Sequence, residues 1–189
     1  MNPRQNLRQD HGHIMQMLVV LHKAVKNPAR RAEWIEKFEG LMDFALVYID
    51  RCHHAKEEDI LFPALEKQQN AGGDLVFRLC REHRDGHALI AAILQQFNAL
   101  KSRPELSFAE LTRLSERYIA LYRQHIRREN AQLLPLMEAC LPAARQARMM
   151  QQFQRLESES MPPRQLKAFL ALLKPAPDQG PANGTTAKK

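Results

Sequence analysis

The sequence contains two copies of a frame, His-x-x-x-Glu, that is followed by a proline ten residues after the histidine. The first copy is His53, Glu57 and Pro63, and the second is His125, Glu129 and Pro135. On a helix, side chains four residues apart share one face, with Cβ atoms about 5–6 Å apart, so the imidazole and the carboxylate can reach one metal ion or two adjacent ions. One copy alone is typical of a charged helix end, but two matched copies predict a metal site.

Both copies belong to an internal repeat of 72 residues. The shift aligns Asp10-His11 with Glu82-His83, His53 with His125, Glu57 with Glu129, and Pro63 with Pro135. Each half therefore has a histidine on one predicted helix and, 42 residues later, the His-x-x-x-Glu frame on the next. This repeat predicts a site shared between the halves with pseudo-twofold symmetry.

The candidate residues lie on the apolar faces of four predicted helices within residues 7–25, 42–60, 76–97 and 111–136. Apolar side chains recur there every three or four residues, the spacing of a helix that packs on a neighbour. Helix-breaking residues separate the segments: Asn27-Pro28, Gly72-Gly73 and Arg103-Pro104. The fold class is therefore predicted to be all-α, an antiparallel four-helix bundle, and Pro63 and Pro135 are expected to end or kink their helices.

Five of the eight histidines fall on these apolar faces, namely His11, His53, His83, His87 and His125. An uncompensated ring or carboxylate in a core costs several kcal/mol, on the order of 2–7, so a partner is required. Bound metal is one solution, and a metal-free network of His and Glu ion pairs is the alternative. His13, His22 and His54 lie off the apolar faces and are expected at the surface.

Several neighbouring residues have simpler interpretations. Asp10 and Glu82 each precede a candidate histidine, but adjacent helical side chains point about 100° apart, so both are expected at the helix surface. Tyr118 and Tyr122 can place a hydroxyl near the site, although core packing is the simpler expectation. Cys80 is expected to be an idle thiol, because the rest of the set fits a dinuclear centre better than a four-coordinate zinc.

Composition restricts the class of protein further. The chain has 189 residues and a net charge of +7, and residues 141–189 hold eight Lys and Arg against three acids. No nucleic-acid-binding motif accompanies these charges, so nucleic acid is not the expected partner. No long apolar run or secretory leader is present, and three cysteines do not form a disulfide framework. A cytoplasmic protein without a membrane span is expected.

Three parts are predicted along the chain. Residues 1–140 form the bundle, residues 141–173 form a short helical C-terminal extension packed outside it, and residues 174–189 form a flexible tail. The last segment is rich in Pro, Gly, Ala and small polar residues, with too few apolar side chains to bury a core of its own.

The pattern H…HxxxE…H…HxxxE, with "KEEDILFP" and "RRENAQLLP" after its two pairs, resembles the hemerythrin-like, HHE cation-binding proteins over about residues 5–140. The resemblance implies a non-haem di-iron (Fe) centre with an oxide or hydroxide bridge. Its imidazole ligands would be His11, His53, His83 and His125, and its bridging carboxylates would be Glu57 and Glu129. Glu57 is preferred to Glu58 because the repeat aligns Glu57 with Glu129 and Glu58 with Asn130.

The chain also departs from the oxygen-carrying hemerythrins. Their fourth helix has His-x-x-x-x-Asp, whereas this chain has His125-x-x-x-Glu129, but His83-x-x-x-His87 matches their third helix. His87 is therefore a candidate fifth imidazole ligand, and a hydrogen-bonding role in the pocket is the alternative. The repeat aligns His87 with Met15 and so does not require it as a ligand.

The resemblance favours binding or sensing of a small diatomic ligand, oxygen or nitric oxide, at an open iron position. Two other functions use the same six ligands. One is an enzyme that turns over peroxide or nitric oxide, and the other is delivery of iron for repair of damaged iron-sulfur centres. Redox potential and gas access separate these functions, and the sequence specifies neither.

Overall fold

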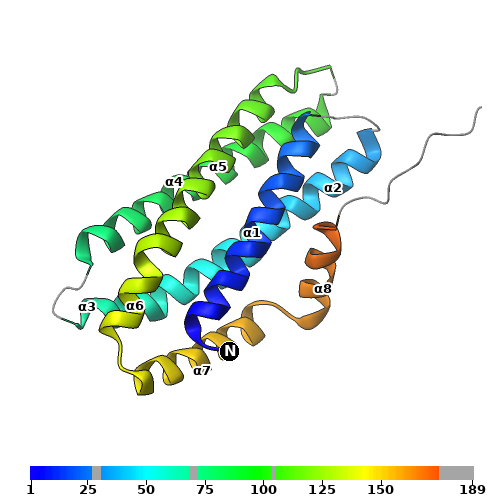
Figure 1. Ribbon diagram of the computed structural model, residues 1–189. Helices are drawn as coiled ribbons and strands as arrows, with labels where there is room; N and C mark the ends of the chain where they lie inside the picture. The colour runs from blue at the N-terminus through cyan, green and yellow to red at the C-terminus, as the bar shows by residue number, and fades with distance from the viewer. Residues whose placement is uncertain (27–30, 69–71, 104, 175–189) are drawn as a thin grey trace, which may run out of the picture.

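The computed structural model describes residues 1–26, 31–68, 72–103 and 105–174. Four helical rods run side by side (Figure 1), and within the described residues all regular structure is helical. The first rod is α1 (Pro3–Lys26); the second is α2 (Arg31–Asp43), η1 (Phe44–His54), η2 (Lys56–Leu61) and α3 (Phe62–Glu66); the third is α4 (Gly73–Ser102); the fourth is α5 (Ala109–Arg128), η3 (Glu129–Leu133) and α6 (Leu134–Cys140). The predicted all-α four-helix bundle is confirmed.

The η segments are stretches of π-helix, and two of them precede the repeated prolines. The Phe62 N–H donates to the Glu57 carbonyl and the Leu134 N–H donates to the Glu129 carbonyl, each five residues earlier. Pro63 and Pro135 follow directly, and both rods stay helical through them. These prolines were expected to end or kink their helices, and they do not end them, because the wider π turn accommodates the proline ring and its missing N–H.

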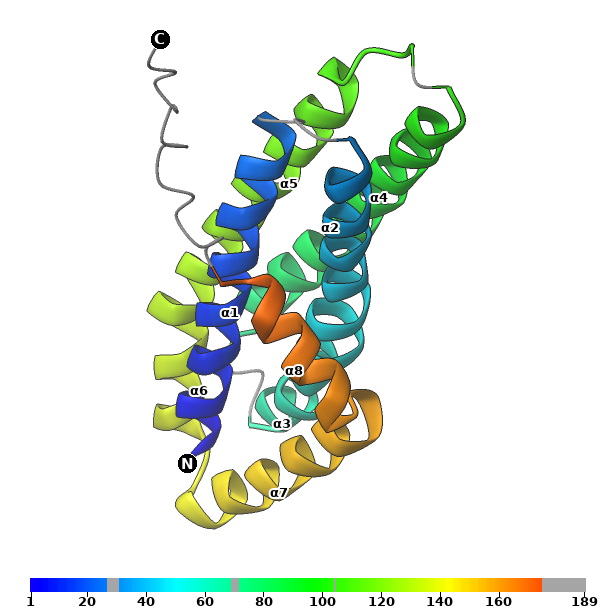
Figure 2. The same cartoon turned by 90° about the vertical axis from the view of Figure 1, so that its right-hand side faces the viewer.

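Two more helices follow the bundle. In Figure 2, α7 (Ala143–Ser160) crosses the lower end of the rods, and α8 (Pro163–Leu172) turns back beside them. The α7 helix contacts α1, η1 and η2, and α8 contacts α2. The division into a bundle, an extension from residue 141 and a tail remains a prediction, and residues 175–189 of that tail lie outside the described residues.

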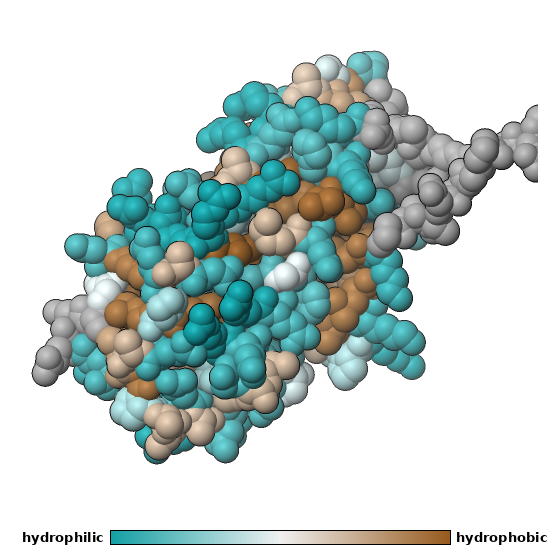
Figure 3. Space-filling model, in the orientation of Figure 1, coloured by the Kyte–Doolittle hydropathy of each residue, from teal (hydrophilic) through white to brown (hydrophobic). Residues whose placement is uncertain are grey.

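The core has two apolar clusters with a polar layer between them. One cluster surrounds Trp34, Phe38 and Phe97, and the other surrounds Leu61 and Phe153. Every rod passes from one cluster to the other, and the buried histidines and glutamates lie between the two. On the face in Figure 3, hydrophilic side chains cover most of the surface, with apolar ones visible between them.

No helix within residues 1–26, 31–68, 72–103 and 105–174 is both long enough and apolar enough to cross a membrane.

Phe153 should anchor α7 to the bundle. Its side chain is fully buried in the cluster that contains Leu7 and Leu61. Phe153→Ala should therefore lower the free energy of unfolding by about 3–5 kcal/mol, measured by denaturant titration of the metal-free protein. Phe77→Ala is the matched control, because Phe77 is 64% exposed. An equal effect of the two substitutions would show that α7 adds nothing to the core.

Candidate metal centre

Six predicted ligand side chains meet in the polar layer between the two apolar clusters. They are at most 3% exposed and come from all four rods: His11, His53, Glu57, His83, His125 and Glu129. Their donor atoms form two overlapping groups, each with all atoms within 4.8 Å of one another. One group is His11, His53, Glu57 and Glu129, and the other is Glu57, His83, His125 and Glu129. The two groups share both carboxylates, so the arrangement offers adjacent positions for two metal ions.

Each carboxylate faces histidines of both halves of the repeat. One oxygen of Glu129 lies 3.2 Å from His11 Nε2 and the other lies 2.8 Å from His125 Nε2. Glu57 Oε2 lies 3.5 Å from His83 Nε2 and 4.0 Å from His53 Nε2. The pseudo-twofold relation expected from the repeat therefore holds for the spatial arrangement of these groups.

The other ring nitrogen of each of these four histidines points outward to an oxygen acceptor. The four Nδ1–acceptor pairs are His11–Asn130 at 3.1 Å, His53–Asp10 at 3.4 Å, His83–Glu58 at 2.5 Å and His125–Glu82 at 2.9 Å. Because these oxygens accept hydrogen bonds, the ring proton lies on Nδ1. The lone pair of Nε2 then faces the centre and can bind a metal ion. Metal-binding histidines are held in this way.

These outer partners follow the same 72-residue repeat as the histidines. Asp10 aligns with Glu82, and Glu58 aligns with Asn130. The expectation that Asp10 and Glu82 lie on the helix surface was wrong: Asp10 is 5% exposed, and the side chain of Glu82 is 15% exposed. Each acid is rotated by about 100° from the histidine that follows it, which turns its carboxylate toward the next rod. There Asp10 meets His53 and Glu82 meets His125.

A cation supports each of these two carboxylates, and the cations also obey the repeat. Lys56 Nζ lies 2.7 Å from Asp10 Oδ2, and Arg128, the aligned residue, pairs with Glu82. The Lys56 side chain is completely buried and also donates to Asn6 Oδ1 at 2.9 Å. Burial would raise the pKa of Asp10, but its bond with His53 and the charge of Lys56 hold that pKa below its usual range.

The α7 helix completes the Lys56 network. Glu157 Oε1 lies 2.5 Å from Lys56 Nζ and accepts a hydrogen bond from Asn6 Nδ2 at 2.8 Å. Lys56 thus connects the C-terminal extension to Asp10 and, through it, to His53. Removing one partner from such a buried set leaves an uncompensated charge, which costs about 3–5 kcal/mol.

The inward-facing atoms fit a metal better than they fit one another. The close contacts of Glu57, Glu129, and the Nε2 atoms of His11 and His53 lack the directions of hydrogen bonds, and these buried atoms have no hydrogen-bond partner. Buried polar atoms are rarely left in this way. The set of four imidazole nitrogens and two carboxylates suits divalent first-row metals, iron among them.

The two histidines of the second half point their Nε2 atoms at each other, 3.1 Å apart. Burial lowers the pKa of His83, but Glu129, Glu57 and Glu58 outweigh burial and raise that pKa to about 11. For His125, Glu129 and Glu82 likewise outweigh burial and raise the pKa to about 9. The carboxylates therefore favour positive charge at this position. In the absence of metal, the charge is carried by protons on His83 and His125.

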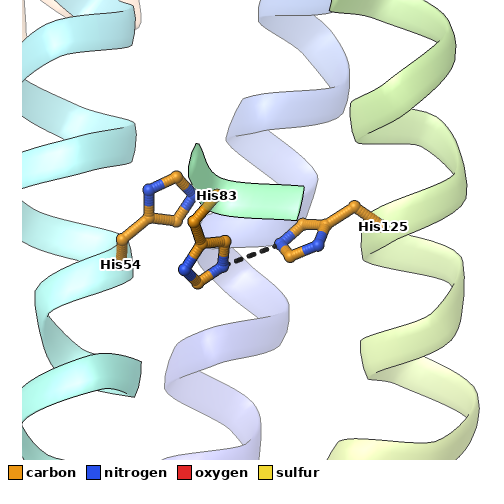
Figure 4. A group of neighbouring side chains, drawn as sticks. All are labelled: His54, His83 and His125. Carbon is orange, nitrogen blue, oxygen red and sulfur yellow. Dashed lines mark hydrogen bonds between the residues drawn. The ribbon is translucent and has the colours of Figure 1, made fainter. Parts of the chain in front are cut away.

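The prediction that His54 lies at the surface was wrong, because the π-helical backbone of η1 turns it inward. It is 2% exposed, and its ring stacks on that of His83 with centroids 3.8 Å apart. Figure 4 shows His54, His83 and His125 brought together from three rods, and their donor atoms lie within 4.8 Å of one another. Burial and the charges of neighbouring rings lower the pKa of His54 well below its usual value, so this ring is neutral.

The structure places His87 away from the six candidate ligands. Its side chain is 47% exposed, and its Nε2 lies 2.6 Å from Asp50 Oδ1. Among the described residues, the groups able to hold a metal include His87 only together with Asp50 and His54. His13 is partly buried and bonds to Tyr48 through Nδ1 at 2.7 Å, and His22 is exposed as expected.

The outer carboxylates should contribute to metal affinity. Asp10→Asn and Glu82→Gln remove the charge that holds His53 and His125, so each should weaken binding of Zn²⁺ by about 10–100-fold, measured by competition with a chromophoric chelator. Asp85→Asn is the matched control, because this exposed acid lies one turn from Glu82 and holds no candidate ligand. Zn²⁺ affinities of the Asp10 and Glu82 variants equal to that of Asp85→Asn would show that these two carboxylates do not support metal binding.

The raised pKa values of His83 and His125 predict that the metal-free protein loses stability at high pH. Their contribution is complete below the ordinary value of 6.5 and is lost as the pH rises through about 9 for His125 and about 11 for His83. Metal-bound nitrogens hold no proton, so the loaded protein should lack this loss. Thermal unfolding at about pH 6.5 and about pH 9.5 measures the difference, and equal losses in both forms would contradict it.

Comparison with known proteins agrees with this geometry. The family model of the Hemerythrin HHE cation binding domain matches residues 2–137, which include all six candidate ligands. No curated protein and no solved structure matches the chain. The matched region covers most of the chain, and the chain belongs to the hemerythrin HHE cation-binding family.

Proposed function

We propose that this protein holds a non-haem di-iron centre that binds or senses oxygen or nitric oxide. Its imidazole ligands would be His11, His53, His83 and His125, and Glu57 and Glu129 would be its carboxylate ligands, shared by the two irons. The supporting observation is that the two carboxylates face histidines of both halves of the repeat while their oxygens lack hydrogen-bond partners. Two irons so held would supply reversible electron exchange and binding of a diatomic ligand.

A pocket beside the centre supports access by a small ligand. It has a volume of about 310 Å³, lies between η1, α4 and α5, and is lined by Asp50, His87 and Tyr122 together with apolar residues that include Ile90 and Leu94. The Tyr122 ring lies 5.9 Å from that of His54 and 5.7 Å from that of His125, measured between centroids. Tyr122 therefore lines the pocket and also lies beside His125, one of the candidate ligands.

A glycine permits this position of the tyrosine. A Cβ atom at Gly86 would lie 2.4 Å from the Tyr122 hydroxyl, closer than any ordinary contact. Tyr122 and Tyr118 are both nearly fully buried, and their rings pack with centroids 4.4 Å apart. The predicted core packing of both rings is confirmed, and Tyr122 also forms part of the pocket wall. The pocket is lined mainly by apolar residues and is large enough to admit a diatomic ligand.

Delivery of iron and turnover of peroxide or nitric oxide use the same six ligands and stay as alternatives. Exposing the reduced protein to oxygen or nitric oxide separates them. A reversible change in absorption with stoichiometric uptake supports binding or sensing. Sustained consumption of nitric oxide or peroxide supports an enzyme, and loss of iron to an apo iron-sulfur protein supports delivery. The cytoplasmic location remains a prediction.

The bridging role of Glu57 and Glu129 can be tested by iron content. Each carboxylate would contact both irons, so Glu57→Ala or Glu129→Ala should reduce bound iron from two per chain to one or none. Asp59→Ala is the control, because Asp59 is exposed. Glu58 is not a suitable control, since its carboxylate holds His83 Nδ1. Two irons retained after both Glu→Ala substitutions would contradict the bridges.

A further inference from the structure

We propose that Asp50, His54 and His87 form an outer site for a divalent metal ion, from which metal enters the dinuclear centre. The proposal rests on the proposed function for the identity of the centre that receives the ion. In this proposal His87 is a ligand of the outer site and not of the dinuclear centre. Buried His54, which is not one of the six candidate ligands, is a ligand of the outer site as well.

The three side chains already lie near the arrangement that one ion requires. Asp50 Oδ1 lies 2.6 Å from His87 Nε2 and 3.7 Å from His54 Nδ1. All three donor atoms lie within 4.8 Å of one another. Ligands about 2.1 Å from one metal ion are about 3–4 Å apart, so modest side-chain rotation suffices. Two imidazoles and one carboxylate form a donor set that divalent Fe, Co and Zn accept.

A simple ion pair between Asp50 and His87 explains those two residues, since both are partly exposed, but it does not explain His54. Both ring nitrogens of His54 are buried, and neither has a hydrogen-bond partner. A structural histidine in a core normally donates or accepts at least one hydrogen bond. The ring instead lies 3.7 Å from Asp50 on one side and stacks on His83 on the other.

His54 therefore belongs to two groups of possible ligands. The outer group contains Asp50 and His87, and the inner group contains His83 and His125. Asp50 and His87 line the pocket between η1, α4 and α5, whereas His83 and His125 belong to the six buried residues. An ion bound by the outer group would thus lie between the pocket and the centre. His54 is the residue that the outer and inner groups have in common.

Titration of the metal-free protein with Co²⁺ tests the outer site directly. The full-length protein should bind three Co²⁺ ions per chain, two in the centre and one outside it. Asp50→Asn and His87→Ala should each weaken the third ion at least tenfold and retain the other two. His54→Gln should also weaken the third ion at least tenfold. Asp74→Asn and His22→Ala are matched controls on exposed residues of the same types, and both should behave like the parent protein.

Uptake of Fe²⁺ gives a second readout. Asp50→Asn and His87→Ala should slow the filling of the metal-free protein at least fivefold while the final content stays at two irons per chain. The outer site is refuted if the parent binds no third Co²⁺, or if these two variants bind it as the parent does. If only the folded His54→Gln variant binds the third Co²⁺ as the parent does, His54 is not a ligand of the outer site. Unchanged rates of Fe²⁺ uptake in Asp50→Asn and His87→Ala would refute the entry route.

These outcomes are distinct from failure of the proposed function. A parent protein that does not hold two irons would overturn the di-iron proposal, yet the difference in Co²⁺ binding between the parent and Asp50→Asn would still decide the outer site. Conversely, two irons in every variant without a third Co²⁺ in the parent would overturn the outer site and leave the di-iron proposal standing.

Discussion

Burial of four imidazoles and two carboxylates between two apolar clusters is the constraint on which the rest of this structure depends. Each of these groups loses its hydration, and the cost is recovered only if every polar atom meets a partner. The outward-facing nitrogens meet oxygen acceptors on neighbouring rods. The carboxylate oxygens of Glu57 and Glu129 and the Nε2 atoms of His11 and His53 face the interior of the site and have no hydrogen-bond partner. Cations held between them would satisfy these atoms together.

The same constraint explains why charge extends outward in layers. Asp10 orients His53 and is itself paired with Lys56, while Glu82 orients His125 and is paired with Arg128. The layers on the two sides then differ, because Lys56 is fully buried and reaches Glu157 of α7. The C-terminal extension therefore contacts only one side of the centre through this network, which gives a nearly symmetric site an asymmetric environment.

Much of this arrangement was predictable from the sequence. The recurrence of apolar residues every three or four positions predicted the four rods. The repeat predicted that His11, His53, His83 and His125 meet two glutamates. The repeat also aligns Lys56 with Arg128 and Asp10 with Glu82, and this pairing of opposite charges could have indicated the outer layer. Treating each acid as an isolated residue beside a histidine concealed it.

The remaining differences come from backbone geometry that residue spacing does not specify. An ideal helix places His54 on a different face from His53, but the π-helical turns of η1 change that angle and bring both rings into the core. The same kind of turn carries the second and fourth rods past Pro63 and Pro135. Conversely, one helical turn places His87 on the same face as His83, yet its side chain meets Asp50 at the pocket.

The central claim is that the six buried residues hold two irons. Its most direct test is the metal content of the purified full-length protein, measured together with absorption spectra of the oxidised and reduced forms. We expect two irons per chain and a spectrum that changes on reduction and returns on oxidation. A fully folded chain that binds no iron after reconstitution, or a single zinc with no redox-dependent spectrum, would contradict it.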